Sequence, residues 1–132
     1  MMIKIKVLLL GVFFVLNFSC LVAACDDESR MLEVTATAYT SSVDETDSTP
    51  NISAWGDRLK PGMRVIAVSR DLLAMGLTHG TLVQVEGFEK DFIVLDKMNK
   101  RWKKKVDLYM GNDKQAALNW GKKKVNICWK YQ

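Results

Sequence analysis

Residues 91–110, which read DFIVLDKMNKRWKKKVDLYM, contain the two strand patterns that decide the fold. From Asp91 to Asp96 the chain is apolar between its two acids, a pattern typical of a strand that is buried on both faces. From Lys105 to Met110 apolar and polar residues alternate, so one face of this strand packs inward and the other carries Asp107. Two strands are therefore predicted, joined by a short and strongly basic connection.

Further short β-rich runs occur on both sides of this stretch. They are Glu33–Tyr39, Arg64–Ser69, Thr81–Gly87 and Lys124–Trp129. The helical signals are a helix at Asp113–Trp120, with Asn112 as N-cap and Gly121 as C-cap, and a short turn at Arg70–Met75. Six short strands favour a closed barrel, because closure removes exposed strand edges. The expected fold class is therefore mainly β, a small six-stranded barrel with one or two short helices.

Residues 1–24 have the pattern of a secretory signal. Residues 7–18 are almost continuously apolar and follow Lys4 and Lys6, and no acidic residue precedes Asp26. The strongly apolar run is shorter than a comfortable membrane span, so cleavage is favoured over an uncleaved anchor. We therefore expect an exported protein of the bacterial cell envelope, in the periplasm or on the periplasmic face of a membrane.

Residues 21–25, LVAAC, resemble the bacterial lipobox, in which a Cys after small residues receives diacylglycerol. We expect lipidation of Cys25, which would make a membrane a partner through the lipid anchor. The alternative is ordinary signal-peptidase cleavage after Ala24, which leaves Cys25 as a plain thiol. Only then is a disulfide with Cys128 possible, since Cys20 leaves with the signal.

The charge balance argues against a nucleic-acid partner. Residues 25–132 contain 17 basic and 15 acidic residues, so little net positive charge remains after export. Six of the basic residues lie between Lys97 and Lys105, which predicts the solvated tip of a hairpin. The single histidine, His79, is expected in a turn. No Cys/His spacing suits zinc, so a metal site built from imidazole and thiolate is not expected.

The two aspartates of the opening stretch are candidate catalytic groups. Asp96 ends its strand, and a connection that folds back would bring it close to Asp107 at one end of the barrel. Two neighbouring carboxylates flanked by cations can acquire different pKa values and act as acid and base. Two ordinary ion-paired aspartates are the alternative. The long polar segment from Thr40 to Asp57 is of a length that is usually functional or disordered.

Together these motifs resemble the three-aspartate (3D) domain, which occurs in membrane-bound lytic transglycosylase A and in bacterial cell-wall proteins. The resemblance covers about Val34 to Trp129. It is carried by TATAY at 35–39, TDSTP at 46–50, Ala54 and Gly56 before Arg58, Gly80-Thr81, DKMNKR at 96–101, VDLY at 106–109 and Trp120-Gly121 before Val125.

The resemblance implies a double-psi β-barrel at residues 34–132, after a short tether at 25–33. Its groove would bind peptidoglycan glycan strands and cleave the MurNAc–GlcNAc β-1,4 bond without metal or cofactor. Asp107 matches the catalytic acid of the transglycosylase, and Asp96 matches the aspartate eleven residues before it. The substrate-binding residues implied are Thr37, Tyr39, Asp47, Lys97, Asn99, Arg101 and Tyr109.

The sequence also departs from the family pattern. Lys97-Met98-Asn99 stands where many members have a Gly-Gly pair, and the third aspartate is Asp47, Asp57 or Asp71. The lytic enzyme has a second, larger domain that is not found in this sequence. Two alternatives to a lytic enzyme therefore stand. One is a peptidoglycan-binding lipoprotein without catalysis, using the basic run with Trp102 or Trp55, and the other is a structural or partner-binding barrel.

Overall fold

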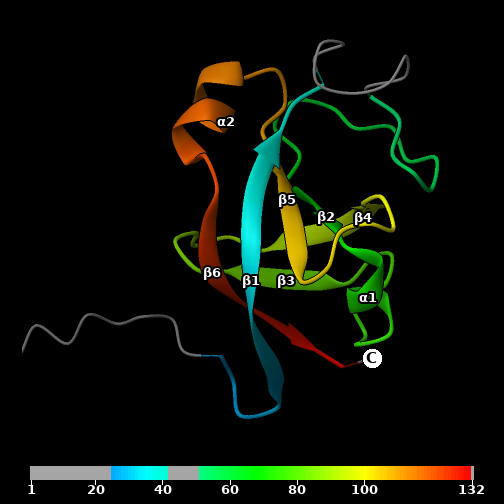
Figure 1. Ribbon diagram of the computed structural model, residues 1–132, viewed down its shortest axis with the longest axis vertical. Helices are drawn as coiled ribbons and strands as arrows, with labels where there is room; N and C mark the ends of the chain where they lie inside the picture. The colour runs from blue at the N-terminus through cyan, green and yellow to red at the C-terminus, as the bar shows by residue number, and fades with distance from the viewer. Residues whose placement is uncertain (1–24, 42–50, 132) are drawn as a thin grey trace, which may run out of the picture.

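The computed structural model describes residues 25–41 and 51–131, which form a closed six-stranded barrel with two short helices (Figure 1). The strands are β1 (Ser29–Tyr39), β2 (Val65–Val68), β3 (Leu82–Val85), β4 (Phe92–Lys97), β5 (Lys105–Tyr109) and β6 (Lys123–Lys130), and the helices are α1 (Arg70–Leu73) and α2 (Lys114–Trp120). The predicted fold class, mainly β with a small six-stranded barrel, is confirmed.

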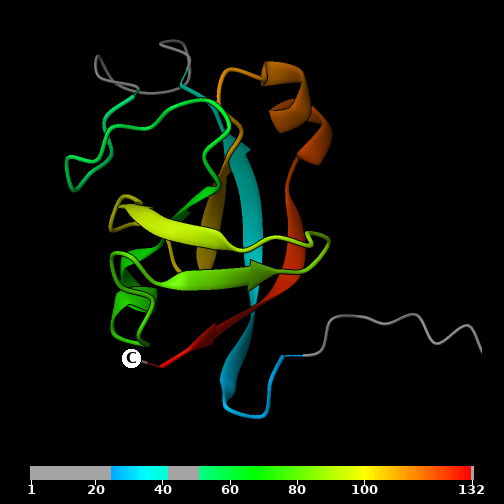
Figure 2. The same cartoon turned by 180° about the vertical axis from the view of Figure 1, so that it is seen from behind.

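The strand order around the barrel is β1-β5-β2-β4-β3-β6. Two pairs are parallel, β1 with β5 and β2 with β4, and the remaining pairs are antiparallel. Figure 2 shows β3 and β4 on the side opposite the long strand β1. Parallel pairs need crossover connections, so strands that follow each other in the chain are not always neighbours. The order agrees with a small double-psi barrel.

The connection between β4 and β5 differs from its prediction for this reason. A hairpin tip was expected between Lys97 and Lys105, but β2 lies between β4 and β5 in the sheet. The basic connection therefore crosses over β2 instead of turning back along one edge. Periodicity along one strand contains no information on which strand will be its neighbour, so the sequence pattern missed this.

The barrel interior is filled by the inward faces of all six strands. Its buried residues include Val34, Ala36, Ile66, Val68, Val83, Val85, Phe92, Val94, Val106, Leu108, Val125, Ile127 and Trp129, joined by Leu72 of α1 and by Leu77. Val106 and Leu108 confirm the alternation predicted for β5. Burial of these side chains is the main favourable term in forming such a barrel.

A second, smaller cluster lies on the outside of the barrel. Leu59, Val65 and Tyr109 are buried there, and Met63 and the outward residues of β4 pack against them. The segment 51–63 thus covers part of the outer sheet surface. The prediction that β4 is buried on both faces holds for its inner face, while outward Ile93 and Leu95 are half-buried under this cover.

Two element ends differ from their predictions. β1 begins at Ser29, because residues 29–33, expected to be a tether, pair with β6. The N-cap of α2 is Asp113, not Asn112, since its carboxylate accepts a hydrogen bond of 2.9 Å from the Ala116 N–H. Gly121 is the C-cap as predicted, with φ of 68°, a conformation that favours glycine.

Cys25 and Cys128 form a disulfide that joins the start of the described chain to β6. Their Cα atoms are 5.9 Å apart, within the usual range for such a bond. The same Cys25 sulfur would carry a lipid, so the two fates exclude each other. The expected signal segment lies outside the described residues, in which no helix is long and apolar enough to cross a membrane.

Candidate functional site

The candidate site is a row of residues on the outer surface of four neighbouring strands. Thr37 of β1 pairs with Asp107 of β5, which pairs with Ala67 of β2, which pairs with Asp96 of β4. Paired residues on adjacent strands point to the same face of a sheet. The two predicted acids therefore lie on one surface, one on each side of the small residue Ala67, with backbones roughly 10 Å apart.

An irregularity in the β2–β4 pairing places Asp96 in this row. Ile66 pairs with Val94, but the next residue, Ala67, pairs with Asp96, so Leu95 is skipped. Val94 lies in the barrel core, and strict alternation would point Asp96 inward as well. The extra residue is a β-bulge, which re-aims the side chains that follow it. It turns Asp96 to the outer face.

The first carboxylate, Asp107, contacts a hydroxyl of the neighbouring strand. The Thr37 hydroxyl donates a hydrogen bond of 3.0 Å to Asp107 Oδ1. Thr37 is its direct partner in the parallel β1–β5 pair, so strand register alone sets this contact. The geometry orients the carboxyl group of Asp107 on the outer surface.

The second carboxylate, Asp96, is held by three donors. Its Oδ1 accepts from the Ala54 N–H at 2.8 Å and from the Lys97 N–H at 2.9 Å. Its Oδ2 accepts from the Tyr39 hydroxyl at 3.2 Å. A carboxylate that is fixed by backbone and phenol donors is well suited to a positioning role.

Tyr39 links the two acids electrostatically. Burial raises the pKa of the Tyr39 phenol well above its usual range, and the charge and hydrogen bond of Asp96 and the charge of Asp107 raise it further. The phenol therefore stays protonated and acts as a donor. Its ring contacts the buried ring of Tyr109, with centroids 5.4 Å apart.

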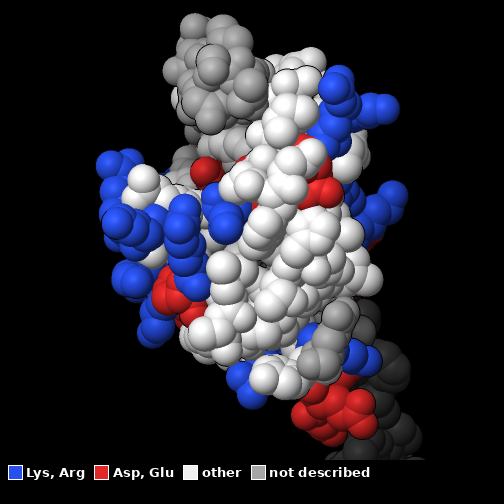
Figure 3. Space-filling view, turned by 90° about the vertical axis from the view of Figure 1, so that its right-hand side faces the viewer, with Lys and Arg blue, Asp and Glu red and all other residues white. Residues whose placement is uncertain are grey.

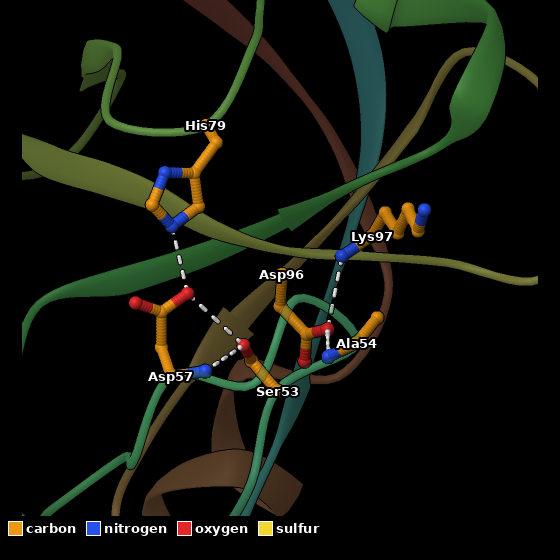
Figure 4. A network of polar contacts seen from close by, with 6 residues as sticks. All are labelled: Ser53, Ala54, Asp57, His79, Asp96 and Lys97. Carbon is orange, nitrogen blue, oxygen red and sulfur yellow. Dashed lines mark hydrogen bonds and ion pairs between the residues drawn. The ribbon is translucent and has the colours of Figure 1, made fainter.

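The Ala54 donor comes from a loop, residues 51–60, that we call the covering loop. Ser53, only 6% exposed, closes it: its N–H donates to the Asp57 carbonyl at 2.8 Å, and its hydroxyl donates to the Asp57 carboxylate at 3.3 Å. His79 Nε2 lies 2.7 Å from the same carboxylate (Figure 4). The Trp55 ring stands edge-on to His79. These contacts anchor the loop above Asp96.

Ser53, Asp57 and His79 do not form a nucleophilic triad. In such a triad the histidine contacts the serine hydroxyl and removes its proton. Here Asp57 stands between the other two, and both contact its carboxylate (Figure 4). The network therefore serves to hold the covering loop in place.

The remaining predicted binding residues are spread around this row. Lys97 Nζ lies over the Trp55 ring, 5.2 Å from its centroid. Asn99 accepts a hydrogen bond from the Arg101 N–H within the β4–β5 connection. Tyr109 is 3% exposed and contacts Ser41 through its hydroxyl, so its ring packs beneath the surface. Asp47 lies outside the described residues.

The two described candidates for a third aspartate have different surroundings. Asp57 belongs to the covering loop, next to the row. Asp71 of α1 accepts a hydrogen bond of 2.9 Å from the Lys104 N–H and so holds the connection before β5. Burial alone would raise the pKa of Asp71, but hydrogen bonds from Ser69 and from backbone N–H groups, with the charge of Lys103, lower it overall.

Sequence reasoning missed His79, Ser53 and the Ala54 N–H. His79 does lie in a turn, as predicted. Its contact with Asp57 spans 22 residues, and no local pattern gives such a distance. Within the described residues, no group of three or more His, Cys, Asp or Glu side chains could hold a metal. A hollow of about 370 Å³ against β3 and β6 contains neither acid of the row.

Comparison with known proteins identifies the fold. No family model matches the chain, and no curated protein matches it in sequence. Two crystal structures of an expansin from Clavibacter michiganensis are similar: the apo protein, with a TM-score of 0.51, and an aspartate-to-asparagine variant in complex with cellohexaose, with a TM-score of 0.50. Both are 17% identical and cover 76% of this chain. The chain spans about half the length of the expansin, as each match covers 50% of it.

Proposed function

We propose that this chain is an exported cell-envelope protein that binds peptidoglycan glycan strands over the row and cleaves their MurNAc–GlcNAc β-1,4 bonds. The observation that carries the proposal is the placement of Asp107 and Asp96 on one outer surface, with the hydroxyls of Thr37 and Tyr39 on their carboxylates. The 3D-domain motifs support it, as does a fold shared with an expansin that has been crystallised with an oligosaccharide.

Asp107 is the proposed acid and base. It protonates the glycosidic oxygen as the bond from that oxygen to the muramyl C1 breaks. The resulting carboxylate then takes the proton from the muramyl C6 hydroxyl as this oxygen bonds to C1. One proton is given and one is recovered, no water is consumed, and the product is a 1,6-anhydromuramyl end.

Asp96 is proposed as a positioning residue and not as the acid. Its three donors orient it, and its negative charge lies on the same face as Asp107. A fixed charge near the reacting sugar favours the positive charge that develops on the ring in the transition state. The Tyr39 phenol, which stays protonated and donates to Asp96, supports this arrangement.

Binding without cleavage is the second candidate, and one observation favours it. The hydrogen-bonding capacity of Asp96 is largely taken up by Ala54, Lys97 and Tyr39, as in a structural carboxylate. A surface of this kind can hold sugar hydroxyls without breaking a bond. The protein would then be a peptidoglycan-binding module of the same envelope.

We further propose residues 1–24 as the export signal and residues 34–132 as the 3D-type domain, with β1 extending its barrel back to Ser29. The fate of Cys25 then decides how the protein is retained. Lipidation would anchor it to a membrane, whereas the disulfide with Cys128 would leave it free of any lipid at that sulfur. The mass of the purified mature protein distinguishes the two, since lipidation adds several hundred daltons and the disulfide removes two hydrogens.

Digestion of purified sacculi tests the proposal. The protein and its Asp107→Asn and Glu89→Gln variants are incubated with sacculi, and products are analysed by mass spectrometry. Glu89 is an exposed acid at the far end of β4 from the row and serves as the matched control. We expect 1,6-anhydromuropeptides from the wild type and the control, and a loss of at least about 100-fold for Asp107→Asn.

Other outcomes of this digestion are equally informative. Products with ordinary reducing ends would mean that water attacks and that the enzyme is a hydrolase. Intact glycan together with co-sedimentation on sacculi would support the second candidate. Intact glycan without co-sedimentation would refute both and leave a structural or partner-binding barrel.

A further inference from the structure

The connection from Lys97 to Lys105, which we call the basic connection, concentrates positive charge on one side of the molecule. It contains six of the 17 basic residues of residues 25–132 and no acid. The other residues of 25–132 include 11 basic and 15 acidic residues, so their net charge is −4. Figure 3 shows a dense group of Lys and Arg side chains on the face where the basic connection and α1 lie. This asymmetry points to an anionic ligand.

The backbone of the basic connection is fixed to the barrel. The Lys104 N–H donates to Asp71, and the Lys105 N–H donates to the Ser69 hydroxyl at 3.0 Å. The Ser69 N–H in turn donates to the Lys105 carbonyl at 2.8 Å. Lys104 adopts a φ of 45°, an unusual conformation for a lysine that these contacts support. Asp71 thus binds the backbone of the basic connection, and among the described residues it forms no ion pair with a side chain of that connection.

The cations of the basic connection form no ion pair with any carboxylate among the described residues. Two of them rest on the half-buried Trp102 ring instead. Lys105 Nζ lies 3.6 Å from the ring centroid, and Arg101 Cζ lies 4.7 Å from it. Cation–π contacts hold two like charges close together and leave their N–H groups available to an anion. Arg101, Trp102 and Lys105 together form what we call the cationic platform.

The cationic platform adjoins the row of acids. Lys105 and Asp107 are two residues apart on β5, and the residue between them, Val106, points into the core. Lys105 and Asp107 therefore project from the same outer face, about 7 Å apart along the strand. A glycan that lies over Asp107 and runs along β5 would therefore bring an adjacent part of the polymer to the platform.

We propose that the cationic platform is a subsite for a carboxylate carried by the glycan, so that the ligand of this groove is an acidic polysaccharide. This rests on the proposed function, whose site it extends. A uniformly charged polymer such as a nucleic acid fits less well, because its phosphates would lie against Asp96 and Asp107. A glycan with spaced acidic substituents places a neutral ring at the aspartates and a carboxylate at Arg101 and Lys105.

Co-sedimentation with two forms of one polymer tests this subsite. Sacculi with free carboxylates are compared with sacculi whose carboxylates have been converted to amides by carbodiimide and an amine. The proteins are the wild type, the Arg101→Gln/Lys105→Gln variant and a Lys122→Gln/Lys123→Gln control. The control removes the same charge and one cation–π contact, since Lys123 Nζ lies 3.8 Å from the Trp120 centroid on the far side of β1.

We expect the wild type and the control to bind free-carboxylate sacculi about tenfold more tightly than amidated sacculi at low salt. The platform variant should lose this preference and bind both forms as the wild type binds the amidated form. Equal weakening of the platform and control variants would overturn the subsite, because only net charge would then matter. Displacement of the wild type by duplex DNA as readily as by free sacculi fragments would also overturn it.

The proposed function can fail separately from the subsite. If the wild type binds neither form of sacculi, then glycan binding itself is refuted. If it binds both forms equally well, the groove binds glycan but the carboxylate subsite is refuted. Circular dichroism spectra and urea midpoints of all three proteins show whether a loss of binding reflects unfolding.

Discussion

Replacing Tyr39 by Phe removes the hydroxyl of β1 that donates a hydrogen bond to Asp96 of β4 across the outer surface. The hydrogen bond to the carboxylate is 3.2 Å long, at the weak end for an oxygen donor and acceptor. A hydrogen bond to a charged group contributes roughly 1.5–3 kcal/mol, so we expect the variant to lose about 1.5 kcal/mol of unfolding free energy at pH 7.

The pH dependence of this loss follows from the pKa of Tyr39, which is raised in the folded protein from its ordinary value of 10.0. Above pH 10 the unfolded chain releases the phenol proton while the folded protein keeps it. The stability of the wild type therefore falls by about 1.4 kcal/mol for each pH unit above 10 through this group alone, and Tyr39→Phe lacks this term. The deficit of the variant should shrink to near zero at about pH 11.

Urea denaturation followed by tryptophan fluorescence measures both quantities. The wild type, Tyr39→Phe and the exposed control Tyr131→Phe are unfolded at pH 7 and pH 11, and absorbance at 295 nm follows phenolate formation. A deficit of the Tyr39 variant that is as large at pH 11 as at pH 7 would refute the reasoning. So would a difference spectrum between wild type and variant that shows a phenolate appearing near pH 10.

Three further changes probe the contacts around the row. His79→Ala should release Asp57 and speed hydrogen exchange at the Ala54 amide by up to about fivefold, whereas His79→Gln, which keeps a donor, should restore most of the protection. Cys128→Ser should cost roughly 2–4 kcal/mol in urea unfolding, because the disulfide closes a loop with a sequence separation of 103; a cost near zero would mean that Cys25 carries a lipid instead. Asp71→Asn should cost at most about 1 kcal/mol at pH 7. Because the pKa of Asp71 is lowered in the folded protein, its contribution is present above the ordinary value of 3.8 and is lost as the pH falls below it, so acid titration of both proteins should bring their stabilities together.

Alternation along each strand was enough to predict most of the barrel. The inward residues Val106 and Leu108, and the outward Asp107 between them, lie as the period of two requires. The six strands were predicted within a few residues of their observed bounds, apart from the longer β1. These features depend only on which face of its strand each residue occupies. A window of about five to ten residues is enough to predict that.

Strand order and register could not be predicted from the patterns of single strands. The placement of β2 between β4 and β5 depends on how the whole chain closes into a barrel, and so the predicted hairpin was wrong. The contact between His79 and Asp57 and the cover over β4 arise from packing of distant segments. The N-cap shifted from Asn112 to Asp113 because two adjacent residues of similar capping strength compete, and tertiary context selects between them.

The position of Asp96 depends on a departure from the local strand pattern. If side chains alternated strictly along β4, the Asp96 carboxylate would be buried in a barrel core lined with Val, Ile and Leu, at a cost of several kcal/mol. The bulge at Leu95 avoids that cost, and it also sets Asp96 opposite Ala67 and within reach of the Tyr39 hydroxyl and the Ala54 N–H. An ordinary apolar residue at position 96 would need no bulge, since it could continue the inward face. The irregular backbone is therefore explained by the acidic residue, because it places the Asp96 carboxylate on the outer surface among the three donors that bind it.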